Sequence, residues 1–276
     1  MSDTQDPMIA DDDEFGPPRP RRKGIYILPN LFTLAALFGG FYAIVMAMNS
    51  HFDNAAIGIF CAMVLDSLDG RVARLTNTQS TFGEHMDSLS DMVSFGAAPA
   101  LIVYEWSLKG LHKLGWIAAF IYCAGAALRL ARFNTNIAVV DRRFFQGLPS
   151  PAAAALVMGM IWLLDDLGFT PEARSGALAW TAFAVTLYAG LTMVTNIPFY
   201  SFKDISFKRT VPFAVIVAIA LFIAVINIHP PTVLFCLFLI YGVSGYGVYV
   251  WKRVKGRPVS VIAMSTDEPD EEGLHR

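Results

Sequence analysis

The sequence predicts an all-α membrane protein, a polytopic bundle of about eight transmembrane helices. Of its 276 residues, 55% are hydrophobic and only 16% are charged, and the mean hydropathy is +0.48. Apolar runs of about 20 residues, the length that crosses a bilayer, recur along the chain. Basic residues gather in alternate connections between these runs. The net charge of −2 gives no reason to expect a nucleic-acid partner.

Eight apolar runs are the predicted membrane spans. In chain order they cover residues 28–49, 55–75, 82–106, 114–133, 150–167, 176–194, 211–228 and 232–251. Prolines at or near several run ends suit positions where a helix begins or bends. The second, third and fourth runs carry charged residues. Segments 152–163, 177–191 and 211–226 are almost purely apolar, so we expect them to pack together and to face lipid.

The charge pattern predicts the orientation of these spans. An even number of spans places both termini on the same side of the membrane. Of the 21 lysines and arginines, all but Lys109, Lys113 and Arg174 fall in segments assigned to that side. Because basic residues concentrate on the cytoplasmic side, both termini are predicted to be cytoplasmic.

The two ends of the chain differ from the apolar middle. Residues 1–24 combine an acidic run with the segment PPRPRR, and the tail contains DEPDEE. Such segments cannot bury enough apolar surface to become ordered. We therefore expect disordered cytoplasmic segments at 1–24 and 259–276, on either side of one transmembrane catalytic domain at 25–258.

Four aspartates lie within the second and third apolar runs: Asp66, Asp69, Asp87 and Asp91. A single ionisable residue at membrane depth is as often a helix-pairing or proton-relay residue as a catalytic one, but four at regular spacing favour a functional site. Asp66 and Asp69 lie about 60° apart on a helix, and Asp87 and Asp91 share a face of the next helix. A six-residue turn at 76–81 makes these helices antiparallel, so the two pairs should converge.

Converging carboxylates in a low dielectric repel one another or become protonated. Divalent cations remove this conflict, and an all-carboxylate donor set favours Mg²⁺ or Mn²⁺. Four aspartates suit two such ions, about 3.5 to 4 Å apart, as in phosphoryl-transfer sites. Gly70 would allow a ligand to approach the helix backbone, and Arg74 suits a phosphate oxygen. Gly83 serves either a ligand or close helix packing.

The spacing from Asp66 to Asp91 resembles, at every defined position, the signature of the CDP-alcohol phosphatidyltransferase family. The resemblance implies that family's fold and a metal-dependent membrane enzyme, with a homodimer as the assembly. In such enzymes an alcohol attacks the β-phosphoryl of a CDP-linked lipid and CMP leaves. It implies that all four aspartates bind metal and that Asp91 is also the general base. The positions it assigns to the CDP-lipid are Gly70, Arg74 and Ser80, with Gly83 beside them.

Five further segments resemble the bacterial CDP-diacylglycerol–serine O-phosphatidyltransferases. They begin at Ile27, Asp91, Ala127, Phe145 and Asn196. This resemblance implies that CDP-diacylglycerol and L-serine are the substrates, and that phosphatidylserine and CMP are the products. It also implies a location in the bacterial inner membrane, with the active site on the cytoplasmic side.

Serine needs a site for its carboxylate and ammonium groups beside the hydroxyl that reacts. Arg129 and Arg132 lie at the predicted cytoplasmic end of the fourth span, with Asn134 just beyond, and an arginine fork suits a carboxylate or a phosphate. The alternative is that these arginines only anchor the helix end. Asn30 and Thr33, where the first span begins, either reach the nucleotide or only start the helix.

Two other functions are compatible with these residues. The first keeps the family and changes the acceptor to glycerol 3-phosphate, inositol phosphate or choline. The second, from another class, is an ion or proton transporter that uses buried carboxylates. Transporters of that kind usually have broken helices or half-chain repeats, and the sequence contains neither pattern.

Overall fold

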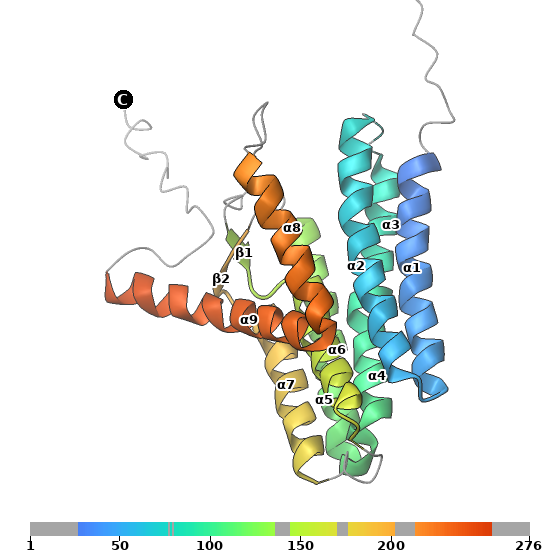
Figure 1. Ribbon diagram of the computed structural model, residues 1–276, viewed down its shortest axis with the longest axis vertical. Helices are drawn as coiled ribbons and strands as arrows, with labels where there is room; N and C mark the ends of the chain where they lie inside the picture. The colour runs from blue at the N-terminus through green and yellow to red at the C-terminus, as the bar shows by residue number, and fades with distance from the viewer. Residues whose placement is uncertain are drawn as a thin grey trace, which may run out of the picture.

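The computed structural model describes residues 27–76, 78, 80–135, 144–169, 176–201 and 213–255. Over these residues the chain forms a bundle of long helices and one two-stranded ribbon (Figure 1). This confirms the all-α class. The ends predicted to be disordered, 1–24 and 259–276, lie outside the described residues.

Each predicted apolar run forms helix, and the ends agree within about three residues. The helices are α1 (Ile27–Met48), α2 (Phe52–Leu75), α3 (Thr81–Asp91), α4 (Ala98–Trp106), α5 (Lys113–Thr135), α6 (Ser150–Asp166), α7 (Ala177–Val194), α8 (Phe213–Ile228) and α9 (Pro230–Val254). The ribbon pairs β1 (Phe144–Gln146) with β2 (Pro198–Tyr200) in antiparallel register, so that Phe145 lies opposite Phe199. It joins the connection after α5 to the connection after α7.

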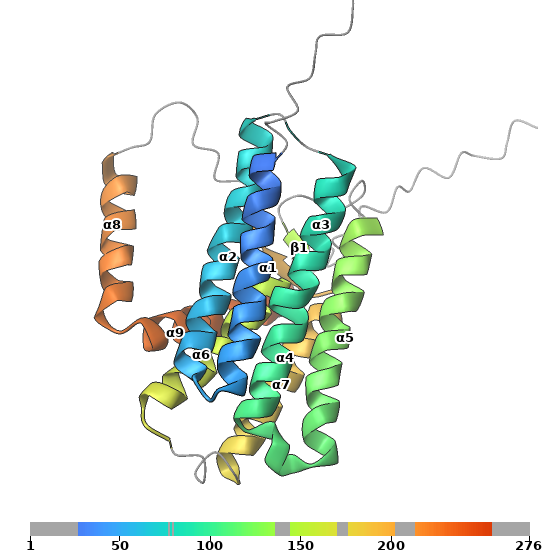
Figure 2. The same cartoon turned by 90° about the vertical axis from the view of Figure 1, so that its right-hand side faces the viewer.

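Helix α1, helix α2, the continuous segment formed by α3 and α4, and helix α5 alternate in direction (Figure 2). The start of α1, the end of α2, the start of α3 and the end of α5 therefore lie at one end of the bundle. All four predicted aspartates come from the parts of α2 and α3 that approach this end. The short connection between α2 and α3 makes these two helices antiparallel, as the sequence predicts.

The third predicted run is not one continuous α-helix. Residues Met92–Ala97 form a π-helix, η2, between α3 and α4. The Ser94 hydroxyl donates to the Ala36 carbonyl of α1 at 3.0 Å, and a methyl group at Gly40 would lie 2.5 Å from the Ser94 oxygen. The backbones of α1 and η2 are therefore in close contact. An extra residue in a helical turn leaves the apolar pattern almost unchanged, which explains why the sequence does not reveal it.

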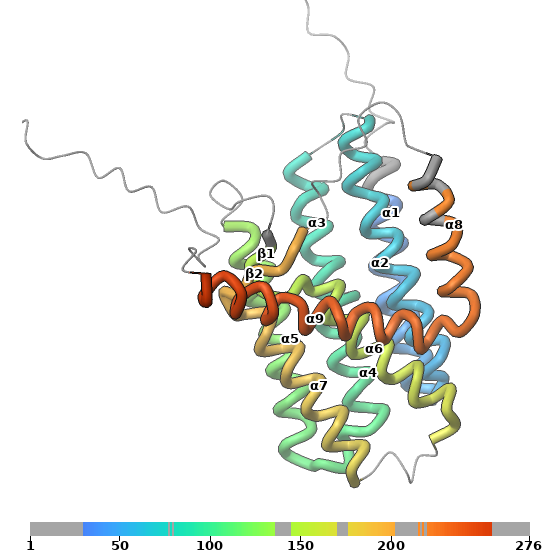
Figure 3. Tube along the Cα trace, turned by 60° about the vertical axis from the view of Figure 1, so that its left-hand side comes forward, coloured from blue at the N-terminus to red at the C-terminus, as the bar shows by residue number. Residues whose placement is uncertain are grey.

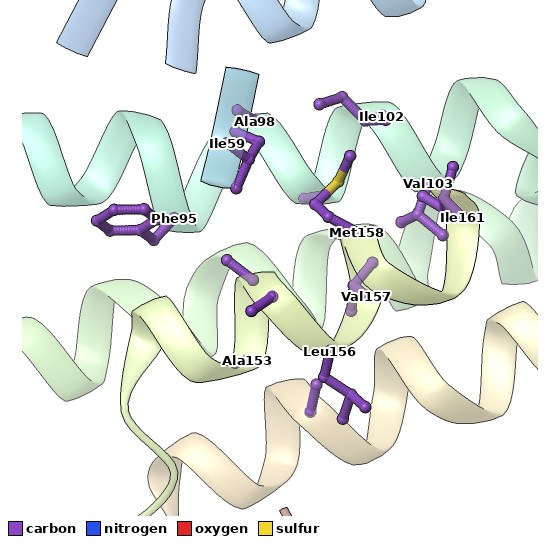
Figure 4. Close-up of a cluster of buried hydrophobic side chains, with 14 of the residues drawn as sticks. Ile59, Phe95, Ala98, Ile102, Val103, Ala153, Leu156, Val157, Met158 and Ile161 are labelled. Atoms are coloured by element: carbon purple, nitrogen blue, oxygen red, sulfur yellow. The ribbon is translucent and has the colours of Figure 1, made fainter. Parts of the chain in front are cut away.

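Helix α6 lies at the centre of the hydrophobic core. Residues 150–161, apart from the half-buried proline at 151, are all buried. Figure 4 shows Met158 on the side of α6 that faces α4, whereas Leu156 lies on the side that faces α7. This corrects the expectation that segment 152–163 faces lipid. The run of alanines at 152–155 lets neighbouring helices approach from several sides, so this segment lies in the interior of the bundle.

Helix α9 crosses the bundle instead of running along it (Figures 1 and 3). It packs against α6 and β2. Among the described residues, four helices are apolar enough by length and composition to cross a membrane: α1 from Asn30 onward, α5, α7 and α9. The apolar helices agree with a membrane protein, and the number of spans stays a prediction.

Candidate active site

Helices α2 and α3 bring three carboxylates together. One oxygen each from Asp66, Asp69 and Asp87 lies within 4.8 Å of the other two. Asp66 is also near enough to both Asp87 and Asp91 for their charges to interact. Carboxylates this close need a shared proton or a cation between them. The structure therefore shows the predicted convergence for Asp66, Asp69 and Asp87.

Helix α1 supports this cluster through Thr33. The Thr33 hydroxyl donates to Oδ2 of Asp69 at 2.8 Å, and both residues are buried. The Thr33 carbonyl accepts from the Ser90 hydroxyl of α3 at 3.1 Å. A single residue of α1 thus connects to both aspartate-bearing helices. Thr33 is bonded to a carboxylate, a role that differs from both alternatives left open by the sequence, a nucleotide contact and a helix start.

The donor set fits a divalent cation. Asp66, Asp69 and Asp87 each offer a carboxylate oxygen to a common point, and such oxygens are the preferred donors for Mg²⁺ and Mn²⁺. A hydroxyl bond such as that from Thr33 holds a ligating carboxylate in one orientation. Asp91 lies outside this group of three, although it contacts Asp66.

The residues predicted to bind the CDP-lipid form two groups beside the carboxylates. On α2, a methyl group at Gly70 would meet nothing within 4 Å, and Nε of Arg74 donates to the Gly70 carbonyl at 2.9 Å. At the start of α3, Ser80 caps the helix by accepting from the Gly83 amide at 3.1 Å. A methyl group at Gly83 would lie 3.4 Å from Oδ1 of Asn30. The face at Gly70 is therefore open, and Gly83 is tightly enclosed.

Asp91 and Arg129 form the inner end of the site. Asp91 is the last residue of α3, directly before η2, and Arg129 is near enough for their charges to interact. Nη1 of Arg129 donates to the Ser150 hydroxyl of α6 at 2.8 Å. Within the described residues, Oδ1 of Asp91 and Nε of Arg129 are buried without a hydrogen-bond partner. Buried polar atoms of this kind need an explanation, and a bound ligand is one.

The predicted group of Arg129, Arg132 and Asn134 does not converge on one point. Nη1 of Arg132 donates to Oδ1 of Asn196 at 3.1 Å, and Nδ2 of Asn134 donates to the Ser88 hydroxyl of α3 at 3.1 Å. Only Arg129 is directed toward Asp91. Three positions within two helical turns point to three different neighbours, so spacing alone could not assign them one ligand.

Sequence reasoning missed several partners of this site. Ser150 binds Arg129, and Gln146 shares Asn196 with Arg132 through a 2.9 Å bond. Tyr241 of α9 lies near Arg129. Of these partners, only Ser150 could have been suspected from the sequence. It lies between two prolines at the start of an apolar helix, where a polar side chain needs a partner. No sequence pattern points to Asn196 or Tyr241 as a partner, since both lie far from Arg129 in the sequence.

Comparison with known proteins relates this site to an enzyme family. The family model for CDP-alcohol phosphatidyltransferase matches residues 26–188. A CDP-diacylglycerol–serine O-phosphatidyltransferase of Helicobacter pylori is 36% identical over 222 residues, 79% of this chain and 90% of the relative. Proteins of the same name from Mycobacterium leprae and Methanocaldococcus jannaschii are 33% and 32% identical. They match 81% and 80% of this chain, and 75% and 95% of the relatives.

Proposed function

Because the chain belongs to the CDP-alcohol phosphatidyltransferase family, we propose that it transfers the phosphatidyl group of CDP-diacylglycerol to the hydroxyl of L-serine, forming phosphatidylserine and releasing CMP. The observation that carries this proposal is the pairing of two features in one site. A carboxylate cluster on α2 and α3 suits the pyrophosphate, and the partly buried Arg129 beside Asp91 suits an acceptor that has a carboxylate. Relatives named for the serine reaction match most of the chain.

Asp66, Asp69 and Asp87 would hold the divalent cation, Mg²⁺ or Mn²⁺, and with Asp91 the set suits two ions. When bound, the cations neutralise charge on the pyrophosphate and on the leaving CMP. The chain's own part is to keep the carboxylates in place. Thr33 orients Asp69 by its 2.8 Å hydrogen bond, and the packing of both α2 and α3 against α1 brings Asp87 to Asp66.

Asp91 is assigned as the general base. The serine oxygen forms a bond to the β-phosphorus, which carries the diacylglycerol, while the bond from that phosphorus to the CMP oxygen breaks. The serine hydroxyl proton passes to Asp91, whose buried Oδ1 lacks a partner among the described residues. Arg129 holds the serine carboxylate through its unpaired Nε. This orientation directs the hydroxyl toward Asp91 and the phosphorus.

The CDP-lipid is assigned to the outer part of the site. The open helix face at Gly70 allows the nucleotide to approach the α2 backbone, with Arg74 one turn away for a phosphate oxygen. Asn30, Ser80 and Gly83 lie together across the start of α1 and α3 and would complete this contact. All these residues fall within the single catalytic domain proposed for residues 25–258.

We place this end of the bundle on the cytoplasmic side of the bacterial inner membrane. Arg71, Arg74, Arg129 and Arg132 lie near the ends of α2 and α5, on the same side as the carboxylates. Lys109 and Lys113, between α4 and α5, lie at the opposite end. Serine then enters from the cytosol. A homodimer is the proposed assembly, by analogy with the family.

The test is CMP release by the purified protein from CDP-diacylglycerol, with serine, glycerol 3-phosphate, inositol phosphate or choline as acceptor. We expect release with serine, loss of it with a chelator, and its return with Mg²⁺ or Mn²⁺. If CMP release depends on another of these acceptors, that alcohol replaces serine as the substrate and the reaction type is unchanged. Full activity in chelator would contradict the metal assignment.

A further inference from the structure

The ribbon and its flanking residues connect the acceptor side of the site to α9. We use "the bracket" for residues 144–150 and 196–200. Its strands join segments that lie far apart in the chain, and it ends at Ser150, the partner of Arg129. The bracket therefore reaches Arg129 through the Ser150 hydroxyl.

The bracket is internally rigid. The Gly147 amide donates to the Ile197 carbonyl at 2.9 Å, and Gly147 has a φ of +74°, which favours glycine. Oδ1 of Asn196 accepts from Gln146 at 2.9 Å and from Arg132 at 3.1 Å. These bonds tie both strands to each other and to α5. A displacement of β2 would therefore move the start of α6, and Ser150 with it.

Helix α9 holds the bracket by two contacts. The Tyr241 hydroxyl donates to the Tyr200 carbonyl at 3.1 Å. Phe199 is completely buried, with its ring centroid 5.7 Å from that of Tyr241, and a methyl group at Gly245 would lie 2.5 Å from the Phe199 ring. The absence of a side chain at Gly245 is what allows β2 to lie this close to α9.

Tyr241 also lies near enough to Arg129 for the two groups to interact electrostatically. The guanidinium of Arg129 thus lies among Asp91, Ser150 and Tyr241, one neighbour each from α3, α6 and α9. Two of these three neighbours belong to the contact between α9 and the bracket. Ser150 is the last residue of the bracket's first segment, and Tyr241 is the α9 residue that binds the bracket. The separation between Arg129 and Asp91 is consequently set in part by α9.

The family model matches only part of the structure around Arg129. The match to the family model ends at residue 188, before β2 and α9. A match that covers 79% of the 276 residues, such as that to the serine-named relative of Helicobacter pylori, has to include β2. Of the elements that support Arg129, β2 and α9 therefore lie beyond the part matched by the family model, whereas β1 and Ser150 lie inside it.

We propose that α9, through Tyr241 and Gly245, sets the acceptor specificity of the site by holding the bracket against Arg129. Tyr241 and Gly245 are positioning residues: they fix the distance between the group that binds the acceptor's carboxylate and the base that takes its hydroxyl proton. This inference rests on the proposed function, because it assigns Arg129 to the carboxylate of serine.

The experiment uses the full-length protein in detergent with CDP-diacylglycerol, and measures CMP release over a range of serine concentrations. Tyr241→Phe removes only the hydroxyl that binds Tyr200, and Gly245→Ala pushes on Phe199. Each variant has a matched control on the same helix. Tyr249→Phe loses a hydroxyl whose contact is a 3.5 Å bond with Arg253, and Gly247→Ala adds a methyl group where nothing lies within 4 Å.

We expect Tyr241→Phe to raise the KM for serine about fivefold, the factor typical of one lost hydrogen bond, and Gly245→Ala to raise it at least as much. The KM for CDP-diacylglycerol should stay within about twofold of wild type. Selectivity for serine over ethanolamine, which lacks the carboxylate, should fall in both variants. General misfolding would instead change both KM values or reduce the active fraction.

Two results would overturn the inference: variants that match their controls, or a parallel rise in both KM values. These outcomes are separable from failure of the proposed function. If wild-type protein releases no CMP in response to serine, the proposed function fails and takes the inference with it. If wild type uses serine and Tyr241→Phe is kinetically normal, only the role of α9 is wrong.

Discussion

The site has a carboxylate side and an acceptor side, and the two are built differently. The carboxylate side comes from one helical hairpin, α2 and α3, with Asp66 and Asp87 partly exposed. The acceptor side is assembled from α5, α6, the bracket and α9, and its central residue, Arg129, is partly buried and bonded to Ser150. Local spacing creates the first side, and tertiary packing creates the second. The difference suggests that chemistry and acceptor choice can vary independently.

The largest expected effect lies on the carboxylate side. Asp91→Asn keeps the shape of the side chain but removes the base, so we expect kcat for CMP release to fall about 10²- to 10⁴-fold. Glu84→Gln, an exposed change in the first turn of the same helix, is the control and should retain activity. Full activity in purified Asp91→Asn would make the assignment of the base wrong.

The two sides also differ in how far the sequence predicts them. The aspartate hairpin was predictable because helical periodicity and a short turn determine which of its residues meet. The joint site of Arg129, Arg132 and Asn134 was not, because their partners Ser150, Asn196 and Ser88 come from three separate elements. The central position of α6 and the crossing of α9 also escaped prediction, since an apolar helix has the same sequence pattern whether it faces lipid or protein.

The next largest effect should come from the acceptor side. Arg129→Gln removes the charge that would bind the serine carboxylate, and we expect the KM for serine to rise about 10- to 100-fold, with a smaller change in the KM for CDP-diacylglycerol. Arg132→Gln is the comparison, because that guanidinium is already bonded to Asn196. Steady-state kinetics with both substrates will compare the KM values of the two variants. Equal effects of the two substitutions would mean that Arg129 is not the specific carboxylate ligand.

A smaller effect should follow from loosening the carboxylate side without removing a carboxylate. Thr33→Val deletes the hydroxyl that orients Asp69 and preserves the shape of the side chain. Loss of such a supporting hydrogen bond typically weakens metal binding about 10- to 100-fold. The concentration of Mg²⁺ or Mn²⁺ for half-maximal activity should rise accordingly, while kcat at saturating metal changes less. Thr181→Val, whose hydroxyl bonds only within α7, is the control. An unchanged metal requirement would limit Thr33 to a packing role.

The smallest effect tests the connection between the two sides. The Tyr122 hydroxyl, on the acceptor-side helix α5, donates at 3.0 Å to the Phe95 carbonyl of η2, and η2 follows directly after Asp91. Tyr122→Phe removes this bond and leaves a buried carbonyl without its partner, which costs about 1 to 3 kcal/mol. We expect Tm to fall by at least about 2 °C, with Tyr104→Phe on α4 as the control.

The kinetic result of Tyr122→Phe separates stability from positioning. If η2 only packs the bundle, kcat well below Tm should equal that of wild type. If the bond also aims Asp91, kcat should fall a few-fold while both KM values stay constant, because the substrates bind elsewhere. We expect the second outcome, since a π-turn shifts the direction of every side chain before it relative to those after it. The carboxylate and acceptor sides would then be coupled through the α5–η2 contact, although their residues could be exchanged separately.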